Sequence, residues 1–232
     1  MIRRVALVAL LVLSACRGSS IGADALGKSE PATTGAKPAP APLAKSSVGT
    51  RPGHVGESKE LTPAPGNALA VFAGGCFWGT EDVFRHVPGV VATAVGYTGG
   101  RTEKPTYEDV CSHTTGHAEA VLVEHDPKKI SYAELLDIFL EAHDPTQKDR
   151  QGPDVGDQYR SAIFTLDAAQ ADIAKKAIAR AQPAHDKPIV TEVTPLGTFY
   201  LAEGYHQQYS ERTGRHSCPL PAGLKKRLGM DT

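Results

Sequence analysis

Hydrophobic periodicity begins only at about residue 67, and this confines the folded core to residues 67–232. The preceding stretch, from Arg17 to about Gly66, consists largely of Ala, Pro, Ser, Gly and Lys and has almost no aromatic residues. Such a segment buries too little apolar surface to offset the entropy lost on ordering. We therefore predict a disordered linker over residues 16–66, followed by one folded domain.

The first fifteen residues combine a basic start with a short apolar run. Arg3 and Arg4 precede "VALVALLVL" and then small residues, as in a secretory signal peptide, and the run is too short to span a bilayer. The following "LSAC", which ends at Cys16, resembles the lipobox of bacterial lipoproteins, so Cys16 is the expected site of lipidation. By the same resemblance Arg17 favours the outer membrane, with the domain exported and facing the periplasm. The alternative is an ordinary signal peptide that happens to contain a cysteine.

Within the folded region, short apolar runs alternate with amphipathic segments that carry helix-capping residues. Ser131 opens a capping box with Glu134, and Asp167 precedes an alanine-rich helix. We predict strands at 68–75, 90–97, 117–126, 159–165 and 189–193, and helices at 76–89, 131–144 and 167–181. This order favours an α+β fold, a two-layer sandwich with a split βαβ (ferredoxin-like) core and a coil-rich C-terminal tail.

Charge and cysteine spacing exclude several classes of function. The formal net charge is -1 and no basic patch stands out, so we expect no nucleic-acid partner. The four cysteines, Cys16, Cys76, Cys111 and Cys218, contain no CxxC pair, so we predict no metal site. The chain is long enough to bury a core without disulfide crosslinks.

Cys76 lies in "GGCFWGTED", between a predicted strand and a predicted helix. A helix N-terminus favours an anion and lowers the pKa of a thiol there. Gly74 and Gly75 permit a tight turn, and Phe77 and Trp78 supply apolar walls. The pattern indicates a reactive thiol; the alternative is an inert cysteine of the core.

Glu119 is unusual because it lies inside the apolar run "GHAEAVLV". In a strand that faces a pocket, burial would raise its pKa, and the acid could hold a proton near neutral pH. The alternative is a strand position exposed to solvent. Tyr97, Tyr159 and Tyr205 lie in glycine-containing polar segments that could be loops beside a site or ordinary surface.

Several motifs of this region follow one another in a recognisable order. They are "GGCFWGTEDVF", "PGVVATAVGYTGG", "PTYEDVCSHTTGHAEAVLVEHDP", "HDPTQ", "GPDVGDQYRSAIF" and "HQQY". Together they resemble the A-type peptide methionine sulfoxide reductases over about residues 71–218. The resemblance implies an enzyme, a peptide-methionine (S)-S-oxide reductase, that reduces methionine S-sulfoxide, free or in oxidised proteins.

The resemblance also assigns a role to each matching residue. Cys76 would attack the sulfoxide sulfur, and Glu119 would protonate the sulfoxide oxygen. Phe77 and Trp78 would form the pocket for the terminal methyl group. The phenols of Tyr97 and Tyr159 would hydrogen-bond the same oxygen. Asp154 would help to hold the polar network of the site.

The same resemblance makes Cys218 the resolving cysteine. It would attack the Cys76 sulfenic acid and form a disulfide, which thioredoxin or an equivalent dithiol would reduce, with no bound cofactor. Many relatives carry a second recycling cysteine further on, whereas here "CPLPAGLKKRLGMDT" follows without one. Cys111 matches a family cysteine without an assigned step, and we expect it to be a packing residue. We further expect a monomer held at the membrane by its N-terminal lipid.

Two other classes of function remain open at this point. A cysteine hydrolase or transferase would pair Cys76 with a histidine base, for which the candidates are His86, His117, His143 and His206. A lipid-anchored binding domain would use the Phe77 and Trp78 pocket without chemistry. Consumption of two thiols per turnover would distinguish a reductase from both.

Overall fold

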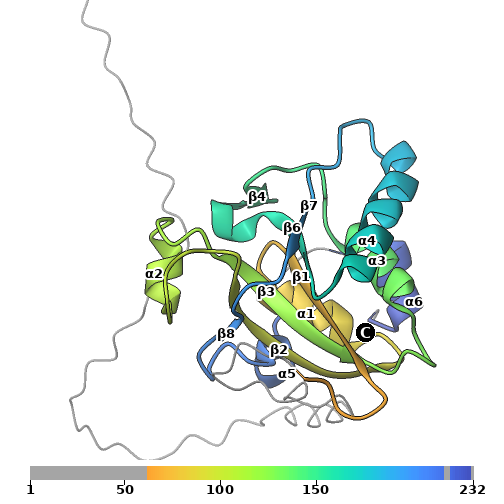
Figure 1. Cartoon of the computed structure of the whole chain (residues 1–232), viewed down its shortest axis with the longest axis horizontal. Helices are drawn as coiled ribbons and strands as arrows, with labels where there is room; N and C mark the ends of the chain where they lie inside the picture. The colour runs from red at the N-terminus through yellow and green to blue at the C-terminus, as the bar shows by residue number, and fades with distance from the viewer. Residues whose placement is uncertain (1–61, 217–219, 231–232) are drawn as a thin grey trace, which may run out of the picture. The chain divides into compact units, whose positions relative to one another are not determined.

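The computed structural model of the chain describes residues 62–216 and 220–230 (Figure 1). The predicted signal peptide, the predicted lipidation site Cys16, nearly all of the predicted linker and Cys218 lie outside the described residues. Among the described residues, no helix is both long and apolar enough to cross a membrane.

The fold is α+β, built on a six-stranded mixed sheet with the strand order β7-β6-β1-β3-β2-β8. Neighbouring strands are antiparallel, except that β6 and β7 are parallel. The six strands are β1 (Ala68–Gly74), β2 (Val90–Thr98), β3 (Ala118–His125), β6 (Ser161–Thr165), β7 (Glu192–Pro195) and β8 (Tyr200–Leu201). A separate pair, β4 (Arg150–Gln151) and β5 (Asp154–Val155), forms a small hairpin.

Helices lie beside these strands in Figure 1. The main ones are α1 (Phe77–Arg85), α3 (Tyr132–Ala142) and α4 (Ala168–Ala181), and the shorter ones are α2 (Tyr107–Cys111), α5 (Tyr209–Thr213) and α6 (Ala222–Leu228). Two 3-10 turns complete the set, η1 (Asp157–Tyr159) and η2 (Gln182–Ala184).

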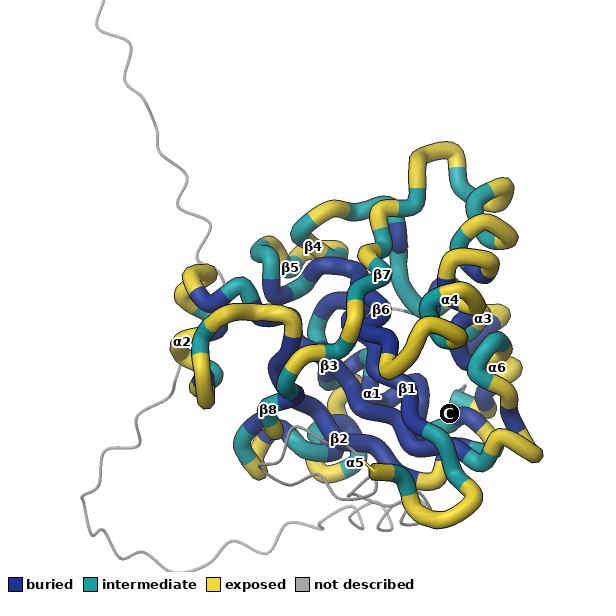
Figure 2. Tube along the Cα trace, viewed as in Figure 1, coloured by how far each residue is buried: buried dark blue, intermediate teal, exposed yellow. Residues whose placement is uncertain are grey.

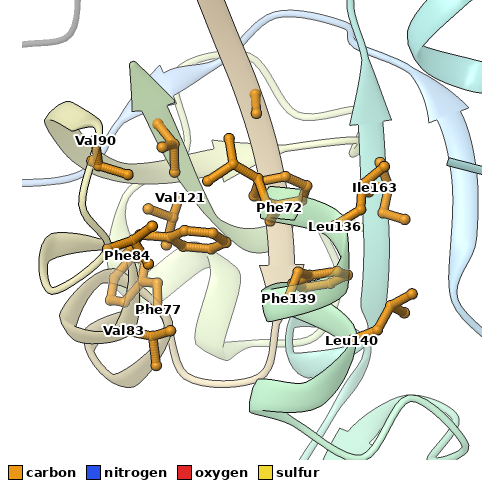
Figure 3. Close-up of a cluster of buried hydrophobic side chains, with 14 of the residues drawn as sticks. Phe72, Phe77, Val83, Phe84, Val90, Val121, Leu136, Phe139, Leu140 and Ile163 are labelled. Carbon is orange, nitrogen blue, oxygen red and sulfur yellow. The ribbon is translucent and has the colours of Figure 1, made fainter. Parts of the chain in front are cut away.

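The central strands β1, β3 and β6 are almost fully buried and dark blue in Figure 2, whereas the edge strands β7 and β8 are partly exposed. Every residue of β3 is buried, including its two glutamates. On the face toward the helices, Phe72 of β1 stacks between Phe84 and Phe139, with 5.0 Å between ring centroids in each pair (Figure 3). Stacked aromatic pairs of this kind add to the stabilisation from burial. They fix α1 and α3 against the central strand β1.

Local sequence signals explain the ends of the main helices. The predicted capping box at the start of α3 is present, with Ser131 Oγ accepting from Glu134 N and the Glu134 carboxylate accepting from Ser131 N. Asp167 caps α4 by accepting a hydrogen bond from Gln170 N at 2.7 Å. These caps satisfy backbone N–H groups that a helix start leaves unpaired.

The predicted last strand begins later than expected, with β7 at Glu192 instead of at Ile189. The reason is that other groups hold the backbone before it: Ile189 N donates to Gln182 Oε1 and Val190 N donates to Pro145 O. These two N–H groups are therefore not available for strand pairing.

The C-terminal tail, predicted to be rich in coil, also contains two short helices that were not predicted, α5 and α6. Leu224 and Leu228, four residues apart, share one face of α6 and are both buried in the core. Gly214 and Gly229 end the two helices in the left-handed conformation that glycine adopts without strain.

Candidate active site

Cys76 lies where the sequence predicted it, at the junction of β1 and α1. It is the N-cap residue of α1, and its side chain is half-buried. Gly75, with φ 93°, makes the turn before it, and a Cβ there would lie 2.6 Å from Gln151 Cβ. The thiol is therefore held at a helix N-terminus, a position that favours an anion.

Glu119 is the buried acid of the site. Its exposed fraction is 2%, and its Oε2 accepts a hydrogen bond from Phe77 N at 3.0 Å. Burial raises the pKa of this carboxyl to about 8; the bond from Phe77 N acts against this rise, and the neighbouring Asp154 charge acts with it. Glu119 is therefore buried, and the alternative of a solvent-exposed position is wrong. The raised pKa favours an acid that keeps its proton near neutral pH.

Tyr97 lies directly opposite Glu119, as its Cα partner across β2 and β3. Residues paired in this way point to the same face of the sheet. The Tyr97 hydroxyl donates to Glu203 Oε2 at 3.0 Å, and Glu203 Oε1 accepts from Tyr107 N at 2.9 Å. Burial, and then the Glu203 charge, raise the pKa of the Tyr97 phenol, so that it stays protonated.

Tyr159 and Asp154 reach the same site from η1 and β5. The pKa of Tyr159 is raised first by burial and then by the charges of Glu119, Asp154 and Cys76, which shows that these groups lie near one another. Burial also raises the pKa of Asp154. The structure thus brings together five residues that the sequence selected, namely Cys76, Glu119, Tyr97, Tyr159 and Asp154.

An aromatic cluster lies at the start of α1. Phe77 is buried at 1% exposure and packs on Tyr97, with 5.9 Å between ring centroids, so it forms the floor of the cluster. Trp78 is half-buried and stacks on Tyr209 with centroids 3.9 Å apart. Its Nε1 donates to His206 Nδ1 at 3.1 Å.

Several residues of this site were not given their structural roles from the sequence, although His206 was named as a possible base. Glu203 and Tyr107 position Tyr97, and His206 and Tyr209 contact Trp78. The only signal for most of them was the polar segment "EGYHQQY", which gave no indication of which side chain would face the site.

Cys111, expected to be a packing residue, is half-buried at the end of α2. Its thiol interacts with the Tyr107 hydroxyl, so it lies at the edge of the site. Cys218 lies outside the described residues, but the described segment just before it contacts α1. His216 Nδ1 is 2.8 Å from Asp82 Oδ2, and Leu220 lines a cavity of about 1010 Å³ together with Gly79 of α1.

The four histidines named as possible bases have other partners. His86 Nδ1 contacts Asp82 O at 2.8 Å, and His117 contacts Gly100 N and Thr102 O through its two ring nitrogens. The remaining two do likewise: His143 contacts Phe139 O and Ser161 Oγ, and His206 Nδ1 accepts from Trp78. Burial lowers the pKa of both His143 and His206 to about 4. These bonds give the rings structural roles.

No group of three or more His, Cys, Asp or Glu side chains that could hold a metal ion occurs within residues 62–216 and 220–230.

The match to known proteins covers most of the chain. Residues 68–229 match the family model described as peptide methionine sulfoxide reductase. A Methanosarcina acetivorans peptide methionine sulfoxide reductase MsrA is 57% identical over 162 residues, which cover 68% of this chain and 86% of that protein. A Brassica napus peptide methionine sulfoxide reductase is 46% identical over 181 residues, covering 78% of this chain and 68% of that protein.

Solved structures agree with these matches. Methionine sulfoxide reductase A of Corynebacterium diphtheriae superposes with a TM-score of 0.65 at 37% identity, covering 78% of this chain and 94% of that one. Mxr1 from Saccharomyces cerevisiae in reduced form superposes with a TM-score of 0.64 at 36% identity, covering 68% of this chain and 92% of that one. The chain therefore belongs to the peptide methionine sulfoxide reductase family.

Proposed function

We propose that the protein reduces methionine sulfoxide, free or in oxidised proteins, to methionine, using Cys76 as the nucleophile and Glu119 as the acid. The observation that carries this assignment is the bond from Phe77 N to Glu119 Oε2, which holds a protonated carboxyl beside the helix start where Cys76 lies. A thiol and an acid in this arrangement are what sulfoxide reduction requires.

In the proposed step, the Cys76 thiolate attacks the sulfoxide sulfur while Glu119 gives its proton to the sulfoxide oxygen. The sulfur–oxygen bond of the substrate breaks and the oxygen passes to the cysteine sulfur. Methionine leaves, and Cys76 becomes a sulfenic acid, oxidised by the two electrons that the substrate gains. The phenols of Tyr97 and Tyr159 donate hydrogen bonds to the same oxygen, for which the Tyr97 hydroxyl turns its proton from Glu203 to the substrate. Asp154 holds the polar network, and Phe77 and Trp78 contact the methyl group.

Recycling uses Cys218 in this proposal. Its thiol attacks the Cys76 sulfenic acid, releases water and forms a Cys76–Cys218 disulfide, which thioredoxin or a similar external dithiol then reduces. The contact of His216 with Asp82 supports this role, because it places a residue two positions before Cys218 against α1, the helix that begins after Cys76. In this proposal the partner dithiol acts on the Cys76–Cys218 disulfide directly.

Three finer assignments belong to the same proposal. The A-type resemblance supports reduction of the S epimer. The order β6-β1-β3-β2, in which each neighbouring pair is antiparallel, supports a split βαβ, ferredoxin-like description of the core. The "LSAC" sequence supports a lipid on Cys16 that holds a monomeric domain to the cell envelope on its periplasmic side, at the outer membrane.

The decisive experiment offers a methionine sulfoxide peptide as separated R and S epimers. We expect the wild-type protein to reduce only the S epimer and the Cys76→Ser variant to reduce neither. The Cys218→Ser variant should complete one turnover but lose cycling with thioredoxin. Full activity of Cys76→Ser would overturn the mechanism, and normal cycling of Cys218→Ser would overturn only the recycling step.

Mass spectrometry of the mature N-terminus tests the anchor separately. An acylated Cys16 as first residue is expected, and an unmodified N-terminus after cleavage elsewhere would contradict lipidation.

A further inference from the structure

We propose that His206 is a positioning residue that fixes the Trp78 indole as the wall of the methyl pocket, and that it thereby determines specificity for an S-methyl sulfoxide. The inference rests on the proposed function and deepens it. Trp78 matches a family pocket residue, but nothing in the sequence indicated what holds its ring in place.

The chemistry of the indole fixes which group donates and which accepts in the hydrogen bond between Trp78 and His206. An indole N–H can only donate, so His206 Nδ1, 3.1 Å from Trp78 Nε1, must accept. The proton of the neutral ring is therefore on Nε2. That atom is buried without a hydrogen-bond partner among the described residues, and it lies 3.9 Å from Glu203 Oε2.

The surroundings keep His206 neutral and immobile. The side chain is 1% exposed, and burial lowers its pKa to about 4, so the Nδ1 acceptor is present at physiological pH. Its ring packs against those of Phe77, Tyr107 and Tyr205, with centroid distances of 5.1, 4.4 and 4.1 Å. A buried acceptor that is held this firmly can orient the group that donates to it.

Trp78 is thus held from two sides. One side of the indole stacks on Tyr209, with an angle of 11° between the planes, and the edge donates to His206. Stacking alone would let the ring slide or rotate in its own plane, whereas the hydrogen bond fixes where its edge lies. Because Trp78 is half-buried, a displaced indole would widen the pocket at its open side.

The consequence concerns the size of the substrate's terminal group. One methylene in a hydrophobic pocket changes kcat/KM by about 10–200-fold when the walls are fixed. We therefore expect the wild-type protein to prefer a methionine sulfoxide peptide to the matching ethionine sulfoxide peptide, and a loosened Trp78 to accept both.

Two substitutions of His206 separate the acceptor from the ring. His206→Phe keeps the ring packing and removes the acceptor, and His206→Asn offers an amide oxygen near the place of Nδ1 with less packing. The expected result for His206→Phe is a methyl-to-ethyl ratio of kcat/KM about tenfold lower, with KM for the methyl substrate raised more than kcat is lowered. His206→Asn should keep most of the ratio, and His86→Phe, a half-exposed ring at the end of α1, should keep all of it.

Trp78 is the only tryptophan of the chain, so intrinsic fluorescence reports on this one contact. We expect His206→Phe to shift the emission maximum and lower the anisotropy, and His206→Asn to stay near the wild-type values. Combining His206→Phe with Trp78→Phe should leave the methyl-to-ethyl ratio within about twofold of that of Trp78→Phe alone, because interacting residues are non-additive.

Each other outcome overturns the inference. The inference is wrong if the wild-type methyl-to-ethyl ratio of kcat/KM is near one, or if His206→Phe leaves this ratio unchanged. It is also wrong if His206→Phe and His206→Asn lower the ratio equally, or if the effects of His206→Phe and Trp78→Phe multiply in the double variant. If His206→Phe does not fold, His206→Leu, which also lacks an acceptor, takes its place. A wild-type protein that reduces neither sulfoxide would contradict the proposed function, whereas normal reduction with any of these outcomes contradicts only the role of His206.

Discussion

Glu119 Oε2 accepts a hydrogen bond from Phe77 N, 3.0 Å away, and this one contact joins the acid of β3 to the first turn of the helix that begins after Cys76. Cys76, the N-cap residue, makes no capping bond with its own side chain. The Glu119 carboxyl therefore fills the place of a cap, satisfying a backbone N–H that the helix start would otherwise leave unpaired. The acid and the thiol are consequently positioned by the same element.

Replacing Glu119 by glutamine should separate its chemical role from its structural role. The amide oxygen introduced by Glu119→Gln would still accept from Phe77 N, but the amide cannot deliver a proton to the sulfoxide oxygen. We expect the single-turnover rate of methionine sulfoxide reduction to fall about 10²–10⁴-fold. Glu124→Gln is the matched control, since Glu124 is equally buried on β3 but bonds Asn67 Nδ2 and Ala64 N. A rate within about twofold of wild type for Glu119→Gln would exclude Glu119 as the acid.

The raised pKa of Glu119 also predicts how stability depends on pH. Its pKa is about 8 in the folded protein, against 4.5 as the ordinary value, so the folded state binds more protons between these limits. The contribution of Glu119 to the free energy of unfolding is therefore fully present below pH 4.5 and is lost as pH rises toward 8. Urea unfolding at several pH values between these two limits should show Glu119→Gln gaining stability relative to wild type as pH rises. A difference in unfolding free energy between the two proteins that stays constant across this range would contradict the raised pKa of Glu119.

The same shift predicts an upper limit for activity. Above about pH 8 Glu119 loses its proton and can no longer protonate the sulfoxide oxygen. Single-turnover rates, which do not depend on the reductant, should fall on the alkaline side with an apparent pKa near 8. A rate that stays level well above this pKa would argue that another group supplies the proton.

Much of the fold could be predicted because its signals are local. The capping box at Ser131, the cap at Asp167 and the glycine turn before Cys76 each act within a few residues, and each is present in the structure. The leucines of α6 carried an equally local signal, Leu224 and Leu228 at helical spacing, but the nearby prolines and glycines favoured a coil.

The rest of the site depends on contacts that no local pattern contains. Gln208, with φ 49°, starts α5 because its backbone N and side chain bond the buried Glu81 of α1. This contact fixes the loop that carries Glu203 and His206 to the helix that carries Trp78. Residues more than a hundred positions apart set this geometry, so the sequence identified the reacting groups but not the residues that hold them.

The two phenols should be partly redundant. Burial raises the pKa of both Tyr97 and Tyr159, so each stays protonated, and the Tyr97 hydroxyl, which donates to Glu203 in this structure, turns to the sulfoxide oxygen when substrate binds. We expect Tyr97→Phe and Tyr159→Phe to lower the single-turnover rate modestly, and the double variant to lower it about 10²–10³-fold. Tyr132→Phe is the control, because the Tyr132 hydroxyl is buried in the core with no hydrogen-bond partner among the described residues. A double variant no slower than either single variant would contradict hydrogen bonding by both phenols.

Replacing Gly75 by alanine should lower stability and activity for two physical reasons, backbone strain and overpacking, whereas only backbone strain applies to Gly152. Both have positive φ, 93° and 57°, but a Cβ on Gly75 would lie 2.6 Å from Gln151 Cβ, while nothing lies within 4 Å of one on Gly152. We expect Gly152→Ala to cost about 1–2 kcal/mol of unfolding free energy from backbone strain, and Gly75→Ala about 2–4 kcal/mol because overpacking is added. Since the displaced turn carries Cys76, the single-turnover rate of Gly75→Ala should also fall, by up to about 10²-fold, with Gly152→Ala near wild type. Equal losses of stability and rate in the two variants, measured by urea unfolding and rapid quench, would show that the contact with Gln151 does not position the thiol.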